Sequence, residues 1–302
     1  MRVTVTGATG RIGTRLVGAL QRRGDEVTVL SRDPGKARVA LGVDAVAWQP
    51  EREPAPAAAL AGRDGVLHLA GEDVAQRWTA EAKRRILSSR ELGTRNLVAG
   101  IRAADPRPGV LVSASGIDYY GPHGSEPLTE ETPPGGDFLA QVCVAWEREA
   151  AAAEELGVRV VRLRTGVALI KGGGALAKML PFFRLGIGGP VAGGQQYLPW
   201  IHVDDLVGLY LAALDEPAWT GAVNATAPEP PTNREFSRAL GRALRRPAVA
   251  PVPGLAVRLL YGEMADIVVS GKRAVPDRAR ALGFAYAHPQ LDEALRSALA
   301  DT

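Results

Sequence analysis

The stretch Thr6-Gly7-Ala8-Thr9-Gly10-Arg11-Ile12-Gly13 decides the fold. It follows an apolar run at residues 2–6 and precedes an amphipathic segment at residues 12–23, so it is a strand-to-helix turn. The first glycine allows a tight turn, the second lets backbone approach a pyrophosphate, and the third permits close helix-on-strand packing. The free N–H groups and the positive dipole end of the helix then face the anion. The stretch predicts a dinucleotide-binding turn made by Gly7, Thr9, Gly10, Arg11, Ile12 and Gly13, the alternative being a glycine turn that the fold keeps without a cofactor.

Outward from this turn, strand-like apolar runs alternate with helix-length segments. Such alternation is typical of right-handed βαβ units and of a parallel sheet covered on both faces. The expected strands are residues 2–6, 26–30, 45–48, 65–69, 110–113, 158–163 and 222–225. The expected helices lie near residues 12–23, 56–60, 79–103, 138–156 and 203–214. The sequence therefore predicts an α/β protein with a Rossmann-type doubly wound parallel sheet.

The pattern changes after Thr226, where three prolines within four residues interrupt the chain. Short helical stretches follow around residues 234–244, 255–261 and 291–299. We therefore expect a cofactor-binding Rossmann domain over residues 1–226 and a small, mainly helical C-terminal lobe over residues 227–302 on the substrate side. The glycine-studded segment 171–200 is expected to be a mobile flap that contains one short helix and contributes to the substrate side.

Composition excludes several classes of protein. The 302 residues are 46% hydrophobic and 23% charged, as in globular proteins and unlike disordered chains. The lone Cys143 permits neither an intrachain disulfide nor a Cys-based zinc site, and the four histidines are scattered, so no metal is expected. A net charge of +3 with dispersed basic pairs predicts solvated helix faces rather than a nucleic-acid surface. The longest uncharged run, residues 185–203, is rich in glycine and proline, so we expect a loop there and no membrane helix.

The start of the chain bears on where the protein is located in the cell. Strand and glycine turn begin at the first residues, which leaves no room for a targeting peptide, so we expect a cytoplasmic protein.

The end of the second strand bears on the choice of cofactor. NAD-specific sites place an acidic residue there, which accepts hydrogen bonds from the ribose 2′-OH. This chain has Ser31-Arg32 instead, and a guanidinium matches the charge and geometry of a 2′-phosphate. The pair predicts NADP(H) rather than NAD(H). Asp33 comes one position late, and its alternative role is that of a turn residue before Pro34.

Three further segments now point to one family. They are His68-Leu69-Ala70-Gly71 after the fourth strand, the run from Ser113 to Gly121 after the fifth, and Trp200-Ile201-His202-Val203-Asp204-Asp205. Together with the first turn, they resemble the extended and atypical short-chain dehydrogenase/reductases, the superfamily of nucleotide-sugar epimerases. The closest likeness is to its "epimerase family" branch, which carries a short C-terminal extension.

The resemblance implies cofactor-binding positions residue by residue. It places the pyrophosphate at the first turn and the 2′-phosphate at Ser31 and Arg32. The remaining cofactor contacts that it implies are Leu69, Ala70 and Gly71 on the adenosine side, Ser113 at the end of the fifth strand, and Arg164 and Thr165 on the nicotinamide side.

The acid–base pair of the redox members is missing here. Those members use a tyrosine and a lysine spaced Tyr-x-x-x-Lys on the helix after the fifth strand, and the lysine helps a phenol with a pKa of about 10 to act near pH 7. Glu147 fits the glutamate that follows the motif, and this register puts Leu139 at the tyrosine and Cys143 at the lysine. No lysine occurs between Arg84 and Ile170, so the tyrosinate mechanism is not available.

Four residues after the fifth strand are candidate substitutes. Ser115 could orient a substrate through its hydroxyl, or be a structural turn residue. Tyr119 or Tyr120 could protonate a substrate, or be a packed aromatic beside Gly121. Asp118 could be a carboxylate base, or a turn or helix-cap acid.

Two more residues have a structural role as the favoured interpretation. Cys143, among small apolar neighbours in mid-helix, is expected to be an inert thiol rather than a nucleophile. His202 and Asp204 do not share a helix face, and Asp204 is expected to cap the following helix.

The sequence thus supports two main functions. The first is an NADP(H)-dependent oxidoreductase or epimerase-type enzyme on a small substrate, such as one resembling a nucleotide sugar. The alternative is a non-catalytic NADPH-binding regulator or scaffold; a non-redox isomerase or lyase is a third. The resemblance also implies a homodimer through the helices at 79–103 and 138–156, although the apolar residues of the first helix, Ile86, Leu92, Leu97 and Ile101, could equally face the protein's own sheet.

Overall fold

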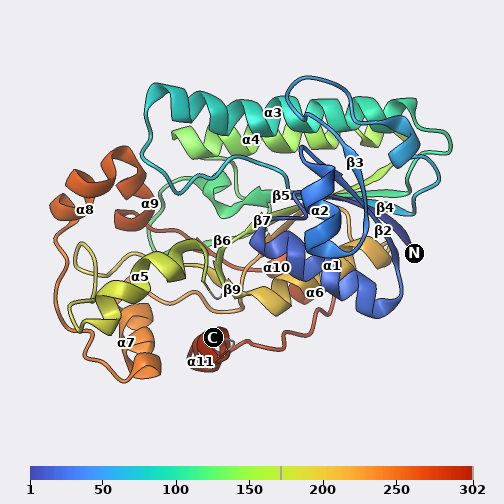
Figure 1. Cartoon of the computed structure of the whole chain (residues 1–302). Helices are drawn as coiled ribbons and strands as arrows, with labels where there is room; N and C mark the ends of the chain where they lie inside the picture. Colours follow the sequence, from blue (N-terminus) through green and yellow to red (C-terminus); the bar gives the residue numbers. More distant parts are fainter. Residues whose placement is uncertain (171, 301–302) are drawn as a thin grey trace.

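The computed structural model describes residues 1–170 and 172–300. The first residue of the expected flap, 171, and the last two residues of the expected lobe, 301–302, lie outside the described residues. The chain folds around one large sheet, with a smaller lobe beside it (Figure 1).

The large sheet is parallel and doubly wound. Its order is β10-β7-β5-β4-β1-β2-β3, so the chain moves outward from β1 in one direction and from β4 in the other. Its strands are β1 (Arg2–Thr6), β2 (Glu26–Ser31), β3 (Asp44–Ala47), β4 (Gly65–His68), β5 (Val110–Gly116), β7 (Arg159–Thr165) and β10 (Gly221–Ala225). The seven predicted strands are confirmed, each within three residues of its expected ends. The order reverses between β1 and β4, and ligands of such sheets bind at the carboxyl ends of the strands beside that point.

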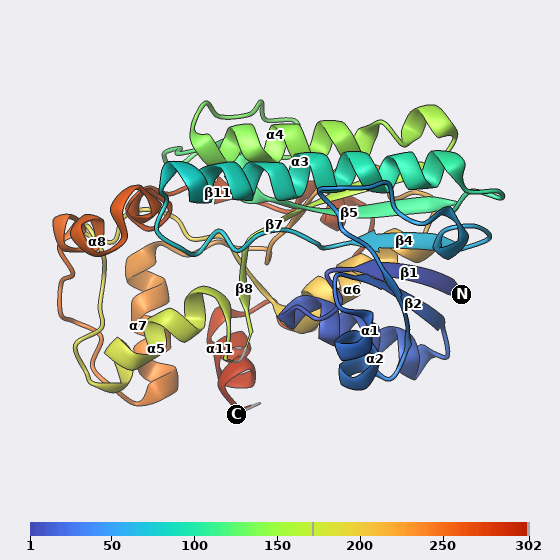
Figure 2. The ribbon, with the colours of Figure 1, turned by 45° about the horizontal axis from the view of Figure 1, so that its top comes forward.

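Helices cover both faces of the sheet. One face carries α1 (Arg11–Arg23), α2 (Pro34–Leu41) and α6 (Val203–Asp215), and the other carries α3 (Ala80–Ala103) and α4 (Phe138–Ala151) (Figures 1 and 2). Neighbouring residues of a strand point to opposite faces. Accordingly Leu67 joins the apolar core under α1 and α6, while Val66 joins the core under α3 and α4. Apolar runs without alternation mark such doubly covered strands, which is why they were readable from the sequence.

Helix α2 is absent from the sequence-based expectation. Asp33 caps it by accepting from the Lys36 N–H, Pro34 occupies its first turn, and Gly42 ends it at φ 65°. Only Ala37 and Leu41 of this helix are buried, so its apolar periodicity is too weak to stand out. The helix expected near residues 56–60 is shorter than predicted, a 3-10 turn at Ala57–Ala59.

The smaller lobe is built from segments on both sides of residue 226. Its apolar core joins α5 (Gly174–Arg184), α7 (Asn233–Leu244) and α11 (Leu291–Ala300) with β8 (Val167–Leu169), which pairs with β9 (Trp200–His202). The short helix expected in segment 171–200 is α5, and its Leu176 is fully packed in that core. Leu180 and Phe183 of α5 are buried in the same core, whereas Phe182, Leu185 and Ile187 are exposed. That the rest of the segment moves as a flap stays a prediction.

The C-terminal segment returns to the large sheet after α8 (Gly254–Tyr261), a 3-10 turn (Gly262–Ala265) and α9 (Asp266–Val269). There β11 (Arg273–Ala274) pairs in parallel with β6 (Pro127–Leu128), and α10 (Asp277–Ala281) packs on β10. Helix α8 is the helical stretch expected at residues 255–261, whereas no sequence pattern predicted β6, β11, α9 or α10.

Two further expectations can be set beside the fold. In the described part of the chain, no helix combines the length and apolarity needed to cross a bilayer. Ile86, Leu97 and Ile101 are fully buried, and Leu97 and Ile101 belong to the core between the sheet and α3. The outer surfaces of α3 and α4 are instead joined by ion pairs, Arg95 with Glu149 and Arg148 with Glu91. Three of the four apolar residues are thus buried in the protein itself, and Leu92 is half-buried. The homodimer that the resemblance implies stays a prediction.

Candidate functional site

The turn between β1 and α1 excludes side chains. Gly7 has φ 68°, and a Cβ there would lie 2.6 Å from the backbone carbon of Leu69. A Cβ on Gly13 would lie 2.3 Å from the Gly7 oxygen. Gly10 occupies the N-cap of α1, where no side chain caps the helix, and both Gly10 and Thr9 are exposed. No side chain of the described residues caps the first-turn N–H groups of α1, from Arg11 to Gly13, and such groups can bind an anion.

The turn after β4 lies directly against the first turn. The Leu69 N–H donates to the Thr6 carbonyl at 3.2 Å, and the Ala70 N–H donates to the Thr6 hydroxyl oxygen at 3.3 Å. The next residue, Gly71, is exposed and lies beside the guanidinium of Arg90. The structure therefore brings the two segments expected to hold the cofactor together at the switch point of the sheet.

Buried His68 lies within hydrogen-bond distance of the residue before the glycine turn and of α3. The His68 ring lies 2.6 Å from the Thr6 hydroxyl through Nδ1 and 3.0 Å from the Thr94 hydroxyl through Nε2. Burial, helped by the charge of Arg90, lowers the pKa of His68 to about 3. A neutral imidazole thus ties β1 to α3 and fixes where the glycine turn begins.

The end of β2 presents an exposed cation, Arg32. Among the described residues no carboxylate pairs with its guanidinium. The Ser31 hydroxyl donates to the Asp33 carbonyl at 3.1 Å. The Asp33 carboxylate accepts from the Lys36 N–H through Oδ1 at 2.9 Å, so it caps α2.

Beyond β5, several predicted site residues form one buried network. The Ser115 hydroxyl donates to Glu147 Oε1 at 2.7 Å, and Arg164 holds the same carboxylate through Nε at 2.8 Å and Nη2 at 2.9 Å. The Tyr120 hydroxyl donates to Asn224 Oδ1 at 2.6 Å and accepts from Arg164 Nη1 at 3.0 Å. Burial raises the pKa of Tyr120 to about 12, although Arg164 opposes that effect.

The sequence left two roles open for Ser115 and for Tyr120, a contact to the substrate or a structural role, and the resemblance placed Arg164 on the nicotinamide side. In the structure their polar atoms bond to buried groups of the protein. Glu147, noted in the sequence only for its spacing from the motif, is a buried anion that needs partners. The side chains of Ser113 and Thr165 also turn to backbone carbonyls, those of Ala114 and Leu163, at 3.2 Å each.

Tyr119 and Asp118 remain nearer the edge of the sheet. Tyr119 is half-buried, and the Arg164 guanidinium lies 3.4 Å from the centre of its ring. This is the packed-aromatic arrangement that the sequence offered as the alternative. The Asp118 side chain is 28% exposed.

The two positions of the missing pair are filled by buried residues. Leu139 and Cys143 lie on the inner face of α4, and burial raises the pKa of the Cys143 thiol to about 12. This is the inert thiol that the sequence favoured. A Cβ on Gly116, the last residue of β5, would lie 3.6 Å from Cys143 Sγ and 3.7 Å from Asp118 Oδ2. Asp118 therefore stands beside the place that the tyrosine–lysine pair would occupy.

A lysine that sequence reasoning missed completes this corner. Lys272 Nζ lies 2.5 Å from Asp118 Oδ1, and Lys272 is 7% exposed. The residues are 154 positions apart, so no local motif joins them. One signal was available, because the chain uses only five lysines among 36 basic residues and one of them is Lys272.

Two histidines that are far apart in the sequence meet away from these turns. His202 caps α6 by accepting from the Asp204 N–H at 3.2 Å, so the cap is His202 and not Asp204 as expected. The Asp204 carboxylate lies 3.6 Å from His202 Nδ1 and 3.8 Å from His288 Nε2. The expectation that the histidines are scattered is thus wrong for this pair. The cap hydrogen bond involves only Nδ1 of His202, and His202, Asp204 and His288 together form a group of side chains that could hold a metal ion.

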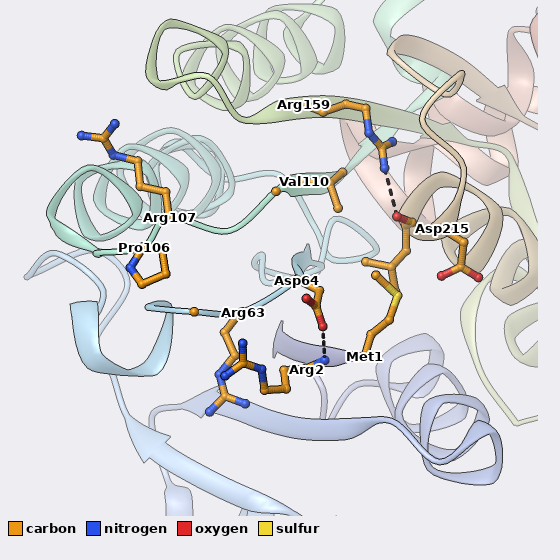
Figure 3. Close-up of a pocket in the computed structure, with 12 residues that line it drawn as sticks. Met1, Arg2, Arg63, Asp64, Pro106, Arg107, Val110, Arg159 and Asp215 are labelled. Atoms are coloured by element: carbon orange, nitrogen blue, oxygen red, sulfur yellow. Dashed lines mark hydrogen bonds between the residues drawn. The ribbon is translucent and has the colours of Figure 1, made fainter.

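A hollow of about 480 Å³ lies at the opposite edge of the sheet, at the amino ends of the strands (Figure 3). Its polar groups are engaged with the protein. Arg159 donates to the carbonyls of Ala213, Leu214 and Trp219, and the Asp64 carboxylate accepts from the Arg2 N–H at 2.6 Å. Because ligands of doubly wound sheets bind at the carboxyl ends, the candidate site is at the glycine turn and not in this hollow.

Comparison with known proteins gives two family matches. The model of the NAD dependent epimerase/dehydratase family matches residues 3–225. A domain of unknown function, DUF1731, matches residues 252–298, which include Lys272.

Similar proteins cover the whole chain. The Epimerase family protein SDR39U1 homolog, chloroplastic, of Arabidopsis thaliana is 42% identical over 98% of this chain and 86% of its own length. The Epimerase family protein YfhF of Bacillus subtilis is 34% identical over 100% of this chain and 99% of its own. The crystal structure of human epimerase family protein SDR39U1 (isoform 2) with NADPH is 35% identical, covers 100% of both chains and has a TM-score of 0.89. UDP-glucuronic acid 4-epimerase of Bacillus cereus in complex with NAD, at 14% identity and TM-score 0.79, is similar in fold alone.

Proposed function

We propose that this chain, which belongs to the NAD dependent epimerase/dehydratase family, binds NADP(H). The family membership makes it an NAD(P)-binding protein of short-chain dehydrogenase/reductase type. It acts, in this proposal, as an oxidoreductase or epimerase-type enzyme on a small polar substrate. One observation carries the proposal. The glycine turn and the turn after β4 meet at the switch point, and the first of them is closed to any side chain at Gly7 and Gly13.

The residues at this point fit a dinucleotide. The N–H groups of Arg11, Ile12 and Gly13 would hold the pyrophosphate at the open end of α1. The backbone of residues 69–71 would line the adenosine side. Glycine stands at positions 7 and 13, where a Cβ would collide with the backbone of the two turns.

The proposal of NADP(H) over NAD(H) rests on the end of β2. Exposed Arg32 offers a bidentate partner to a 2′-phosphate, while the nearby Asp33 is engaged as the cap of α2. The 35% identical human relative was crystallised with NADPH, which agrees with this choice.

The chemistry proposed for the chain's own residues centres on Asp118. When bound, the cofactor supplies hydride transfer. Asp118 would bind and position a substrate hydroxyl, with its Oδ2 facing the edge beside Gly116. Tyr119 would form a wall of the substrate side, and the buried network of Ser115, Glu147 and Arg164 would hold β5 and α4 in place.

A non-catalytic NADPH-binding regulator is the second candidate. Its support is the loss of the acid–base pair, with Leu139 and Cys143 both buried in α4. Turnover of NADPH with any carbonyl compound, lost in Asp118→Asn, would favour the enzyme. Cofactor binding without turnover across such a panel would favour the regulator.

The test of cofactor binding compares NADPH with NADH by fluorescence and calorimetric titration. We expect wild-type protein to prefer NADPH, and Arg32→Ala to weaken NADPH binding at least about tenfold while NADH binding stays unchanged. Arg22→Ala, in the last turn of α1, is the matched control and should change neither. Equal weakening of both cofactors by Arg32→Ala would contradict the 2′-phosphate role. Failure of wild type to bind either would remove the enzyme and the regulator together.

The expected cytoplasmic location is also a proposal. It is supported by the single, buried and unpaired Cys143, which is typical of reducing compartments. The Arabidopsis relative is named as chloroplastic, so relatives reach other compartments. Cell fractionation would decide the location of this chain.

A further inference from the structure

We propose that Lys272, a residue of the C-terminal segment, is the cation of the candidate active site and forms with Asp118 a charge pair that faces the reacting end of the bound dinucleotide. The inference rests on the proposed function, because it needs a cofactor at the carboxyl edge of the sheet. In this proposal the C-terminal segment supplies a residue to the reaction and does not only cover the site.

The position of Lys272 is fixed from both sides. The residue after it starts β11, whose Ala274 pairs with Leu128 of β6. The residue before it, Gly271, accepts a hydrogen bond from the His123 N–H at 2.8 Å. A Cβ on Gly271 would lie 2.6 Å from the Tyr197 nitrogen, so only glycine permits this close approach. The segment therefore holds the lysine against the loop after β5.

The Lys272 ammonium has more hydrogen-bond donors than the acceptors found for it in the described residues. A lysine ammonium has three donors, and buried donors are normally satisfied. Within residues 1–170 and 172–300, Asp118 Oδ1 is the one hydrogen-bond acceptor found for Lys272, although this side chain is only 9% exposed. Two donors of a nearly buried cation are thus available to an oxygen of a ligand, and they lie next to the second oxygen of Asp118.

The neighbours of the pair place it at the reacting end rather than elsewhere along the edge. Asp118 Oδ2 and Cys143 Sγ both approach the same side of Gly116, at the end of β5. Gly116 belongs to the central strand next to β4, whose following turn meets the glycine turn. A dinucleotide that begins at α1 and crosses the switch point extends toward this corner.

The chemistry that follows is proton donation to a substrate oxygen. When bound, the reduced cofactor would supply a hydride to the carbon of a substrate carbonyl, and the C=O π electrons would move to the oxygen. The Lys272 ammonium gives that oxygen one proton, which yields an alcohol, an oxidised nicotinamide and a neutral amine that regains its proton from water. An alkylammonium and a phenol are acids of similar strength, so a lysine can replace a tyrosine in this step. The substrate class is therefore a carbonyl or secondary alcohol.

The test uses the cofactor alone, so it needs no substrate. The oxidised nicotinamide ring is positively charged and the reduced ring is neutral. Lys272→Met leaves the Asp118 carboxylate unpaired and should lower the ratio Kd(NADP⁺)/Kd(NADPH) about five- to tenfold. Asp118→Asn leaves the ammonium and should raise the ratio by a similar factor, as expected for a unit charge several ångströms away. Opposite signs from the two variants cannot arise from a general loss of structure.

Lys83→Met is the matched control. Lys83 of α3 pairs with Glu263 near the C-terminal lobe, so this variant also breaks an ion pair between the two parts of the chain, but at the surface. We expect it to leave the ratio unchanged. A ratio that stays constant in both Lys272→Met and Asp118→Asn, while wild type binds NADPH and Arg32 governs that binding, would overturn this inference and leave the proposed function standing. Absence of binding in wild type would instead remove the proposed function.

Discussion

Arg164 and Glu147 form a two-pronged ion pair in the interior, with Nε–Oε1 at 2.8 Å and Nη2–Oε2 at 2.9 Å. Both side chains are at most 5% exposed. The pair joins β7 to α4 beneath the end of β5, where Ser115 also donates to the same carboxylate. The edge of the sheet that carries Asp118 is therefore stabilised by a buried charged network as well as by apolar packing.

Removing one partner of this pair should be costly. In Glu147→Gln the Arg164 guanidinium loses a buried counter-ion, and we expect the free energy of unfolding to fall by about 3–5 kcal/mol. Chemical denaturation monitored by circular dichroism measures this change. The double variant Glu147→Leu with Arg164→Met leaves no buried charge, so it should be less destabilised than the single variant. A loss below about 1 kcal/mol in Glu147→Gln would show that water reaches the pair.

The closed turn predicts a steric effect on cofactor binding. In Gly13→Ala the new Cβ would meet the Gly7 oxygen at 2.3 Å and two backbone atoms of Ala8 below 3.0 Å, so the turn has to shift. We expect loss of NADPH binding by at least about tenfold, measured by the fluorescence titration used for Arg32, together with a lower melting temperature. Gly136→Ala is the matched control, because no atom lies within 4 Å of its Cβ position. Unchanged affinity in Gly13→Ala would mean that the dinucleotide does not bind at this turn.

Features that depend on residues close together in the sequence could be predicted, and features that depend on distant residues could not. The seven strands were readable because each is a short apolar run, and the glycine turn because its geometry is set within eight residues. The cap of α2 is local as well, but it supports a helix with only two buried residues, too few to give a periodic signal.

The candidate site was predictable only where it depends on adjacent residues. Ser31, Arg32 and the two turns were predicted in this way. The partners of Ser115 and Asp118 are 32 and 154 positions away, and only the folded sheet brings them together. The sequence therefore predicted which residues gather at the edge, but not which of them bond to one another inside and which remain for a ligand.

The burial of Cys143 predicts an unreactive thiol. Burial raises its pKa to about 12, so at pH 8 the thiolate fraction is lower than that of an ordinary cysteine by about a thousandfold. We expect alkylation of the native protein by iodoacetamide to be at least about a hundredfold slower than alkylation of the protein unfolded in guanidinium, as followed by mass spectrometry. The chain has one cysteine, so the unfolded sample is its own control. Rapid labelling of the native protein would show that α4 opens readily at this point.

Buried His68 predicts how stability depends on pH. Its pKa in the folded protein is about 3, against about 6.5 in an unfolded chain, so below pH 6.5 the unfolded state binds a proton that the folded state does not. The stability contributed by neutral His68 is fully present above pH 6.5 and is lost as the pH falls toward 3, by about 1.4 kcal/mol per pH unit within that window.

Carboxylates add their own pH dependence, so the test is the difference between wild type and His68→Gln in urea denaturation at pH 4, 5, 6 and 7. The variant is expected to be less stable at pH 7 and to lose stability less steeply on acidification, because glutamine can bond to Thr6 and Thr94 without titrating. Parallel curves for the two proteins would mean that His68 accepts a proton in the folded state and that the base of the glycine turn is open to water.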